Sequence, residues 1–367
     1  MSDCAPLLAL LELSNAIRSG QKIPPKKKET TKGPIESIID DMKKHPDDPE
    51  RLDDGIAMLS GYALVPHNNN VLVKCGGVEV IIGAMKKHIE ETMLVMSCLG
   101  VLQNVAVNPN HWQRLREAGV VKSSMLVVKH HKSFDAIQAI GAFLFHTLAR
   151  DEEFRKSLAK NGAIEAVATG MQLHKTFSEM QMQGCLALNR FASDVALFPK
   201  IFRAKGVAAL FDILEHHPQN MSLVTPAFQL LVELSSKCKV SDRPEFNEQA
   251  NVKVLGKMVR SNKGILQYAC FLLKNLAFSA PEKVLRDGGA DALVYCMKTN
   301  RTEMDLQMMC CHGLRDVVSS CKDLQENMQT SKSMVMELLS RVERDYKDFE
   351  YLRVLASDIL NLLEDAA

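Results

Sequence analysis

The fold is decided by a stretch that occurs twice, as Gly33-Pro34-Ile35-Glu36-Ser37-Ile38-Ile39-Asp40-Asp41-Met42-Lys43-Lys44-His45 and, 43 residues later, as Gly76-Gly77-Val78-Glu79-Val80-Ile81-Ile82-Gly83-Ala84-Met85-Lys86-Lys87-His88. Both copies place apolar residues three and four positions apart, the helical period, between a Gly and a basic end. Similar starts follow at Gly119, Gly162, Gly206 and Gly289, with degenerate ones at Asn251 and Lys332. The steps from Pro34 to Lys332 average about 43 residues, as in three-helix solenoid repeats. The sequence therefore predicts eight copies of one helical unit.

Each copy follows the same internal plan. A short polar helix is expected before the Gly, as at residues 110–117 and 152–160, and a second helix after it, as at residues 78–85. A longer third helix follows, as at residues 90–107 and 265–278. The Gly between the first two helices suits a left-handed backbone or a close approach of two backbones. Because no unit can bury its apolar face alone, the units are expected to stack.

The composition fits such an array and argues against several other classes of protein. The chain has 367 residues, 46% of them apolar and 24% charged, and a net charge of +1. It is too apolar for wholesale disorder, and its charge does not favour nucleic-acid binding. Aromatic residues make up only 5%, which disfavours an all-β fold. No transmembrane segment is expected, because no apolar run reaches the roughly 18 residues that a span needs.

The N-terminal segment is predicted to be separate from the array. Residues 1–19 are expected to form an N-terminal helix that covers an exposed apolar end or, as the alternative, docks on a partner. Residues 20–33, which include Lys26-Lys27-Lys28, are expected to be a flexible basic linker. The repeat array is assigned to residues 34–367. Met1 and the polar end Leu363-Glu364-Asp365 favour a complete chain.

The ends of the third helices carry a recognisable motif. Leu102-Gln103-Asn104-Val105-Ala106 and Leu273-Lys274-Asn275-Leu276-Ala277 resemble the Leu-x-Asn-Leu-Ala that ends the third helix of armadillo repeats. HEAT repeats are the near neighbour, but the Gly between the first two helices and the three-helix rhythm favour the armadillo family. The resemblance covers residues 34–367. It implies an all-α fold, a right-handed α-solenoid superhelix of about eight three-helix armadillo-type repeats.

The resemblance also implies a concave groove, lined by third helices, that binds extended peptides in the family. The motif Asn resembles the family's ladder residue, whose amide can both donate to and accept from a peptide backbone. The residue four positions earlier shares its helical face. The protein-binding groove implied in this way contains Asn104, Phe143, Thr147, Arg190, Glu233, Phe271, Asn275, His312 and Asp316.

Among these positions, Phe271 with Asn275 is the full aromatic–amide pair, whereas Arg190 and Glu233 make the middle of the groove charged. No groove position holds the Trp that lines this surface in nuclear-import members of the family, which argues against a receptor for basic peptides. The alternative at each position is that the side chain only packs or faces water.

Adjacent histidines could suggest metal sites. Seven histidines recur at the ends of second helices: His45, His88, His130, His131, His174, His216 and His217. Neighbouring residues on a helix point about 100° apart, so the adjacent pairs do not converge on one ion. We interpret these histidines as cations that complement helix C-termini, and their stacking predicts a rim that gains positive charge below about pH 6.5. No metal and no cofactor is therefore expected.

The ten cysteines form no CxxC pair, and most lie in apolar helical runs. They are interpreted as reduced, buried thiols, which predicts a cytoplasmic location, with the nucleus as the alternative.

The chain has no P-loop, no HExxH and no GxSxG, so an enzyme is not predicted. The predicted function is a non-enzymatic scaffold or adaptor that binds partner peptides or helices in the groove. The alternative is a regulatory cofactor of a chaperone or small GTPase that promotes nucleotide exchange. The sequence leaves the partner and the oligomeric state open.

Overall fold

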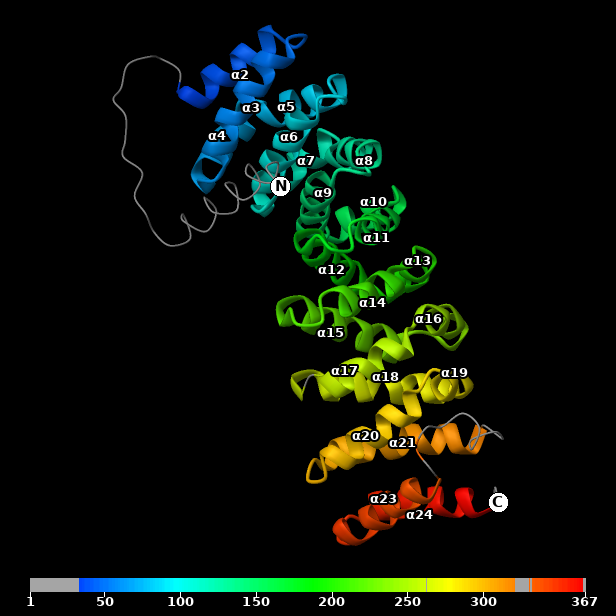
Figure 1. Cartoon of the computed structure of the whole chain (residues 1–367). Coiled ribbons are helices and arrows are strands. Elements are labelled where there is room, and N and C mark those ends of the chain that lie inside the picture. Colours follow the sequence, from blue (N-terminus) through cyan, green and yellow to red (C-terminus); the bar gives the residue numbers. More distant parts are fainter. Residues whose placement is uncertain (1–32, 262, 321–329, 331, 366–367) are drawn as a thin grey trace. The chain divides into compact units, whose positions relative to one another are not determined.

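The computed structural model describes residues 33–261, 263–320, 330 and 332–365. Within these residues the regular structure consists of 22 α-helices and short 3-10 helices, with no strand (Figure 1). This confirms the all-α fold. The predicted N-terminal helix at residues 1–19 and the linker at residues 20–33 lie, apart from Gly33, outside the described residues.

The helices recur in the predicted order of first, second and third helix. The first helices are α4 (Pro66–Lys74), α7 (Trp112–Glu117), α10 (Glu152–Lys160), α13 (Phe198–Arg203), α16 (Arg243–Gln249) and α19 (Pro281–Arg286). The second helices are α2 (Pro34–Lys44), α5 (Gly77–Lys87), α8 (Val120–His130), α11 (Ala163–Leu173), α14 (Gly206–His216), α17 (Val252–Ser261), α20 (Gly289–Thr299) and α23 (Lys332–Asp345). The third helices are α3 (Pro49–Ala63), α6 (Thr92–Ala106), α9 (Asp135–Leu148), α12 (Ser178–Ala192), α15 (Met221–Lys237), α18 (Leu266–Ser279), α21 (Met304–Ser320) and α24 (Glu350–Asp365). The pairs of second and third helices match the eight predicted units.

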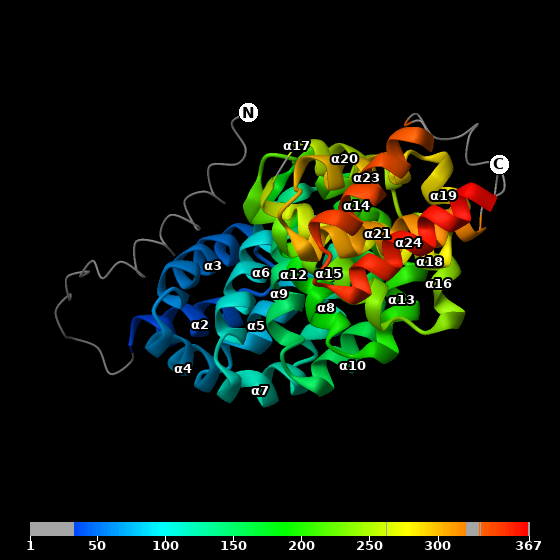
Figure 2. The same cartoon turned by 90° about the horizontal axis from the view of Figure 1, so that it is seen from below.

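The chain divides into two compact units, unit 1 (Met1–Ser193) and unit 2 (Asp194–Ala367). The division falls between α12 and the 3-10 helix η2 (Val195–Leu197), which is also a boundary between repeats. In unit 1 the helices form three rows: first helices α4, α7 and α10, second helices α2, α5, α8 and α11, and third helices α3, α6, α9 and α12. Figure 2 shows these rows side by side. In unit 2 the successive third helices α15, α18, α21 and α24 likewise pack against one another.

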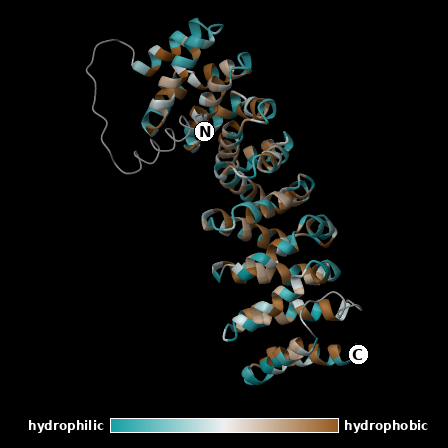
Figure 3. Cartoon of the chain, in the orientation of Figure 1, coloured by the Kyte–Doolittle hydropathy of each residue, from teal (hydrophilic) through white to brown (hydrophobic). Residues whose placement is uncertain are grey.

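The core lies between the rows, and the third helices contribute much of it. Phe145, Phe191 and Phe228, on the third helices α9, α12 and α15, are fully buried. Most helices carry both hydrophobic and hydrophilic residues, as expected where one face packs and the other meets water (Figure 3). Stacking therefore buries the apolar face that a single repeat cannot bury alone.

The junction between first and second helices uses a left-handed backbone, as the Gly pattern predicted. The residues with positive φ are Gly76, Gly119, Gly162 and Gly288, and at the equivalent place in unit 2 Lys205, with φ 61°. Lys205 is the one non-Gly residue of this kind in the described chain. The next residue, Gly206, meets a second constraint, because a Cβ atom there would lie 2.7 Å from Cγ2 of Ile201. Both uses of Gly inferred from the sequence therefore occur.

A buried Gln joins the second helix to the third in three repeats. The side-chain amide of Gln138 donates to the carbonyls of Val128 and His131, at 2.8 and 3.0 Å. Gln181 on α12 and Gln307 on α21 make the same two bonds, to residues ten and seven positions earlier. These bonds satisfy carbonyls that a helix end leaves without an intrahelical partner.

The recurrent histidines lie where the sequence predicts, at the ends of second helices. Nε2 of His88 donates to the carbonyl of Pro46 at 2.9 Å. His131 and His174 make the same bond to Ile89 and Lys132, at 2.7 and 2.9 Å, and every acceptor lies 42 residues earlier. These histidines therefore tie each repeat of unit 1 to the one before it. The predicted gain of charge along their rim stays a prediction.

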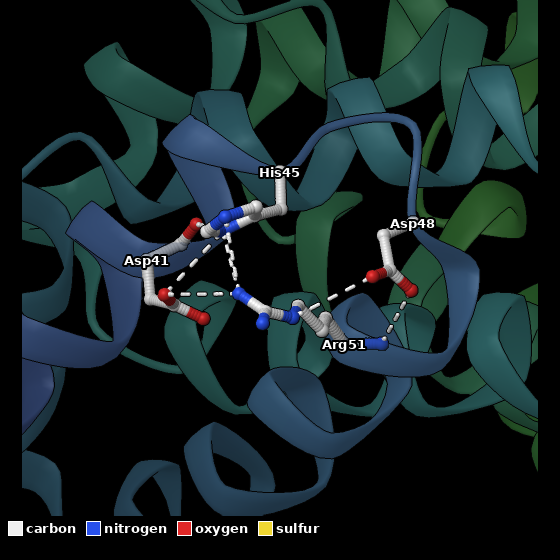
Figure 4. Close-up of polar contacts among 4 residues, drawn as sticks. All are labelled: Asp41, His45, Asp48 and Arg51. Carbon is white, nitrogen blue, oxygen red and sulfur yellow. Dashed lines mark hydrogen bonds and ion pairs between the residues drawn. The ribbon is translucent and has the colours of Figure 1, made fainter.

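His45, in the first repeat, is held differently (Figure 4). Its Nδ1 atom lies 3.0 Å from the carbonyl oxygen of Asp41, and Nη1 of Arg51 lies 3.0 Å from its Nε2 atom. Arg51 also pairs with the carboxylate of Asp48, whose Oδ1 atom caps α3. Because these groups are half exposed, the network adds little to stability.

Among the described helices, no single one is both long and apolar enough to cross a bilayer. The bent pair Thr92–Ala106 and Pro109–Glu117 would qualify by length and composition alone.

Candidate binding pocket on the third helices

Unit 2 contains a pocket of about 310 Å³ between the ends of three successive third helices. Its walls come from α15 and the turn after it, from the first helix α16, and from α18 and α21. The lining residues are Ser235, Ser236, Cys238, Arg243, Phe246, Asn247, Lys274, Asn275, Leu276, Phe278, Ser279, His312, Arg315 and Asp316. Neighbouring repeats therefore build this pocket together.

Hydrogen bonds between helices hold the polar wall in place. Nδ2 of Asn275 donates to Oγ of Ser235 at 3.0 Å, which links α18 to α15. Oγ of Ser279 donates to Oδ1 of Asn247 at 3.1 Å, which links α18 to α16. The side-chain carbonyl of Asn275 is on the same amide, so this residue can present an acceptor to a bound segment while its NH2 group is engaged.

The lining is predominantly basic, with Arg243, Lys274 and Arg315 against the single carboxylate of Asp316. Arg315 pairs with Asp316 at 3.1 Å. The other two cations lie over aromatic rings: Arg243 is 5.3 Å from the ring centre of Phe278, and Lys274 is 4.7 Å from that of Phe271. The pocket therefore favours a negatively charged group over a positive one.

His312 lies at the α21 side of the pocket. Its Nε2 atom is 3.0 Å from the hydroxyl of Tyr351 on α24, and the two rings are 5.7 Å apart. Burial lowers the pKa of His312, and the nearby Arg315 and Lys274 lower it further. The imidazole is consequently neutral near pH 7, so it offers a hydrogen-bonding ring rather than a fourth cation.

Several residues of the predicted groove meet at this pocket. Asn275, His312 and Asp316 line it, and Phe271 contacts it through Lys274. Glu233, on α15, pairs with Lys237 of its own helix at 2.7 Å and does not line the pocket. The structure therefore places four of the nine predicted residues together in unit 2.

The other four predicted residues, Asn104, Phe143, Thr147 and Arg190, lie on third helices of unit 1. Thr147 is only 4% exposed, which leaves little of it to a partner, whereas Asn104, Phe143 and Arg190 are half-buried. The role of all nine residues as a partner-binding surface stays a prediction.

The residues that sequence reasoning missed are the cations. Lys274 and Arg315 each lie one position before a predicted groove residue, and Arg243 belongs to a first helix. The signal was present inside the motif itself, where Lys274 is the variable position of Leu-Lys-Asn-Leu-Ala. The sequence could not show where the Lys274 side chain points, because a rotation of about 100° per residue allows it to face either the groove or solvent.

Comparisons with known proteins agree with this architecture. The family model described as "ZER1-like_2nd: Protein zer-1 homolog-like, C-terminal domain" matches residues 125–351. No curated protein sequence matches the chain.

Solved structures share the fold at low sequence identity. An engineered protein from the Northeast Structural Genomics Consortium is 19% identical, with a TM-score of 0.58, over 90% of this chain and 78% of that one. A designed armadillo repeat protein in complex with the peptide (KR)4 is 15% identical, with a TM-score of 0.54, over 66% of this chain and 99% of that one. The fold is therefore that of an armadillo repeat solenoid, as the sequence resemblance implied.

Proposed function

The chain belongs to the family of the zer-1 homolog-like C-terminal domain, and on this premise we propose that it is a non-enzymatic scaffold that binds an extended segment of a protein partner. The segment lies across the third helices of unit 2 and places an acidic side chain in the pocket. The observation that carries this proposal is the pocket itself, which successive third helices line with the amide of Asn275 and two cations, while the first helix α16 adds the third cation. A repeat array uses such a shared surface for extended chains.

The chemistry of the pocket supports an acidic anchor in particular. Its formal charge is positive, because three cations face one carboxylate and His312 is neutral. Arg315, already paired with Asp316, can share its guanidinium with a second carboxylate, since it carries five N–H donors. Phe278 is 65% exposed beside Arg243, and it offers apolar contact next to the charged part.

The decisive experiment compares matched double variants of the two units. Purified chain is used to capture protein partners, and the affinity of each partner is then measured for Phe271→Ala/Asn275→Ala and for Phe143→Ala/Asn104→Ala. We expect the unit 2 variant to lose a few kcal/mol of binding free energy, while the unit 1 variant binds as the unchanged chain does. Circular dichroism checks that both variants keep their helicity.

If neither variant weakens binding, the third-helix surface is not the interface and the proposal is wrong. An equal loss in both variants would extend the surface into unit 1 and contradict an anchor restricted to unit 2.

The cellular location is part of the same proposal. The cysteines that the structure describes are free thiols, and most of them are buried. We place the protein in a reducing compartment, the cytoplasm or the nucleus.

A further inference from the structure

Three cysteines that are far apart in the sequence meet in the core of unit 2. Cys270 is on α18, Cys296 on α20 and Cys310 on α21. Sγ of Cys270 lies 3.4 Å from Sγ of Cys296 and 4.0 Å from Sγ of Cys310, and all three sulfurs are within 4.8 Å of one another. We call this group the thiol cluster. It is separate from the binding pocket, whose lining includes none of the three residues.

The spacing of the sulfurs suits a single ion at their centre. An ion bonded to three sulfurs at about 2.3 Å, the length of a metal–thiolate bond, holds them roughly 4 Å apart. The sulfurs of the cluster are already about this far apart, so the three helices would need to move only slightly to bind the ion. Simple packing of thiols needs no such convergence, because each sulfur could equally contact an apolar neighbour.

The donor set selects the kind of ion. All three candidate ligand atoms in this group are sulfur, which favours soft thiophilic ions. The group provides three ligands, whereas structural zinc is almost always bound by four. All three residues are 0% exposed, so solvent does not reach the sulfurs to supply a fourth ligand. These conditions together favour a monovalent copper ion.

One neighbouring polar group supports this assignment. Nδ2 of Asn300, which follows α20, lies 3.7 Å from Sγ of Cys296. The same Nδ2 group also lies 3.0 Å from the carbonyl of Cys296 and 2.9 Å from Oγ1 of Thr299, so it is shared among three acceptors. An N–H group shared in this way with a sulfur still helps to stabilise a thiolate, as outer partners of metal ligands commonly do. Asn300 is half-buried and Thr299 beside it is exposed, so opening the last turn of α20 would bring solvent to the cluster.

We propose that Cys270, Cys296 and Cys310 form a three-coordinate site for one copper(I) ion. Each thiol that binds the ion as a thiolate gives its proton to solvent, and copper keeps its oxidation state. Binding therefore strengthens as pH rises.

The test uses the full reduced chain under anaerobic conditions, with copper(I) buffered by the chelator bathocuproine disulfonate. We expect one copper ion per chain and three sulfur neighbours by X-ray absorption. Cys296→Ser should weaken the apparent affinity by about 100-fold or more. Cys311→Ser is the matched control, because Cys311 is equally buried and adjacent to Cys310 but outside the cluster. Its affinity should equal that of the unchanged chain.

Two outcomes would overturn the proposal. One is equal copper affinity in the unchanged chain and Cys296→Ser, and the other is an equal loss in Cys296→Ser and Cys311→Ser. Should Cys296→Ser fail to fold, X-ray absorption on the unchanged chain decides alone, since fewer than three sulfur neighbours contradicts the site. Because the partner-binding pocket contains none of these residues, this result is independent of the proposed function.

Discussion

The two units are built from the same repeat, yet their third helices meet in different ways. In unit 1, Nδ1 of His146 on α9 donates to the carbonyl of Leu186 on α12 at 3.1 Å, and the neighbouring Thr147 is buried. In unit 2, Asn275 reaches Ser235 near the end of α15, and the helix ends enclose a basic pocket. The contact in unit 1 ends at a backbone carbonyl, whereas the contact in unit 2 joins two side chains that both line the pocket. The same repeat can therefore be joined to its neighbour through the backbone or through side chains that border a pocket.

The largest expected effect concerns the charge of the pocket. Lys274→Glu/Arg315→Glu should weaken binding of an acidic partner by about 2–5 kcal/mol, because like charges would then face each other in a partly enclosed space. Isothermal titration measures the loss. The control Lys86→Glu/Lys298→Glu changes the net charge equally at exposed positions of α5 and α20 and should change affinity little. Equal losses in both pairs would mean that only the overall charge matters.

The next prediction concerns the buried Gln that joins the second helix to the third, and tests whether it stabilises both units. Gln181→Leu in unit 1 and Gln307→Leu in unit 2 should each lower the free energy of unfolding by about 1–3 kcal/mol. Each change removes two buried hydrogen bonds to carbonyls. Urea denaturation followed by circular dichroism gives the values. A large loss of unfolding free energy in only one of the two variants would show that these hydrogen bonds stabilise only that unit.

A smaller effect on the free energy of unfolding is expected to have opposite signs in the two units. Lys205→Gly should raise the free energy of unfolding by about 1 kcal/mol or less, because it relieves a left-handed backbone in a residue with a side chain. The ion pair of Lys205 with Glu248 is exposed, so its loss offsets little of this gain. Gly162→Lys should destabilise unit 1 by a similar amount. Thermal melts of both variants test the pair, and two changes of the same sign would contradict the comparison.

The smallest effect is on pH dependence. Burial lowers the pKa of His146, and His312 is shifted in the same direction while being less enclosed. The unfolded chain then binds more protons below the ordinary His pKa of about 6.5. Stability is therefore complete above that pH and declines as pH falls through it. Urea titrations at pH 7.5 and 5.5 should show a smaller decline for His146→Gln than for the unchanged chain. The decline measured for His312→Gln should differ less from that of the unchanged chain than the decline for His146→Gln does. A larger difference for His312→Gln would contradict this order of the two units.

Much of the fold was accessible from the sequence because its signals are local and repeated. The helical period, the Gly at the start of most second helices and the terminal histidines each depend on a few neighbouring residues. Repetition eight times over makes such weak signals decisive. The nine groove positions were a weaker inference, since they assume that every third helix presents the same face. The structure brings Asn275, His312 and Asp316 to one pocket, while Thr147 is buried.

The sequence by itself determined the repeat, its helices and its junctions, because backbone conformation and helical period are properties of short segments. Only the tertiary structure decided which side chains share a space. The pocket joins residues from 235 to 316, and the thiol cluster joins three cysteines that are 26 and 14 residues apart. Such meetings depend on how far each helix advances and turns against its neighbour, and a difference of one residue rotates a side chain by about 100°. For that reason the charge of the pocket, which the near-neutral composition conceals, became visible only in the folded chain.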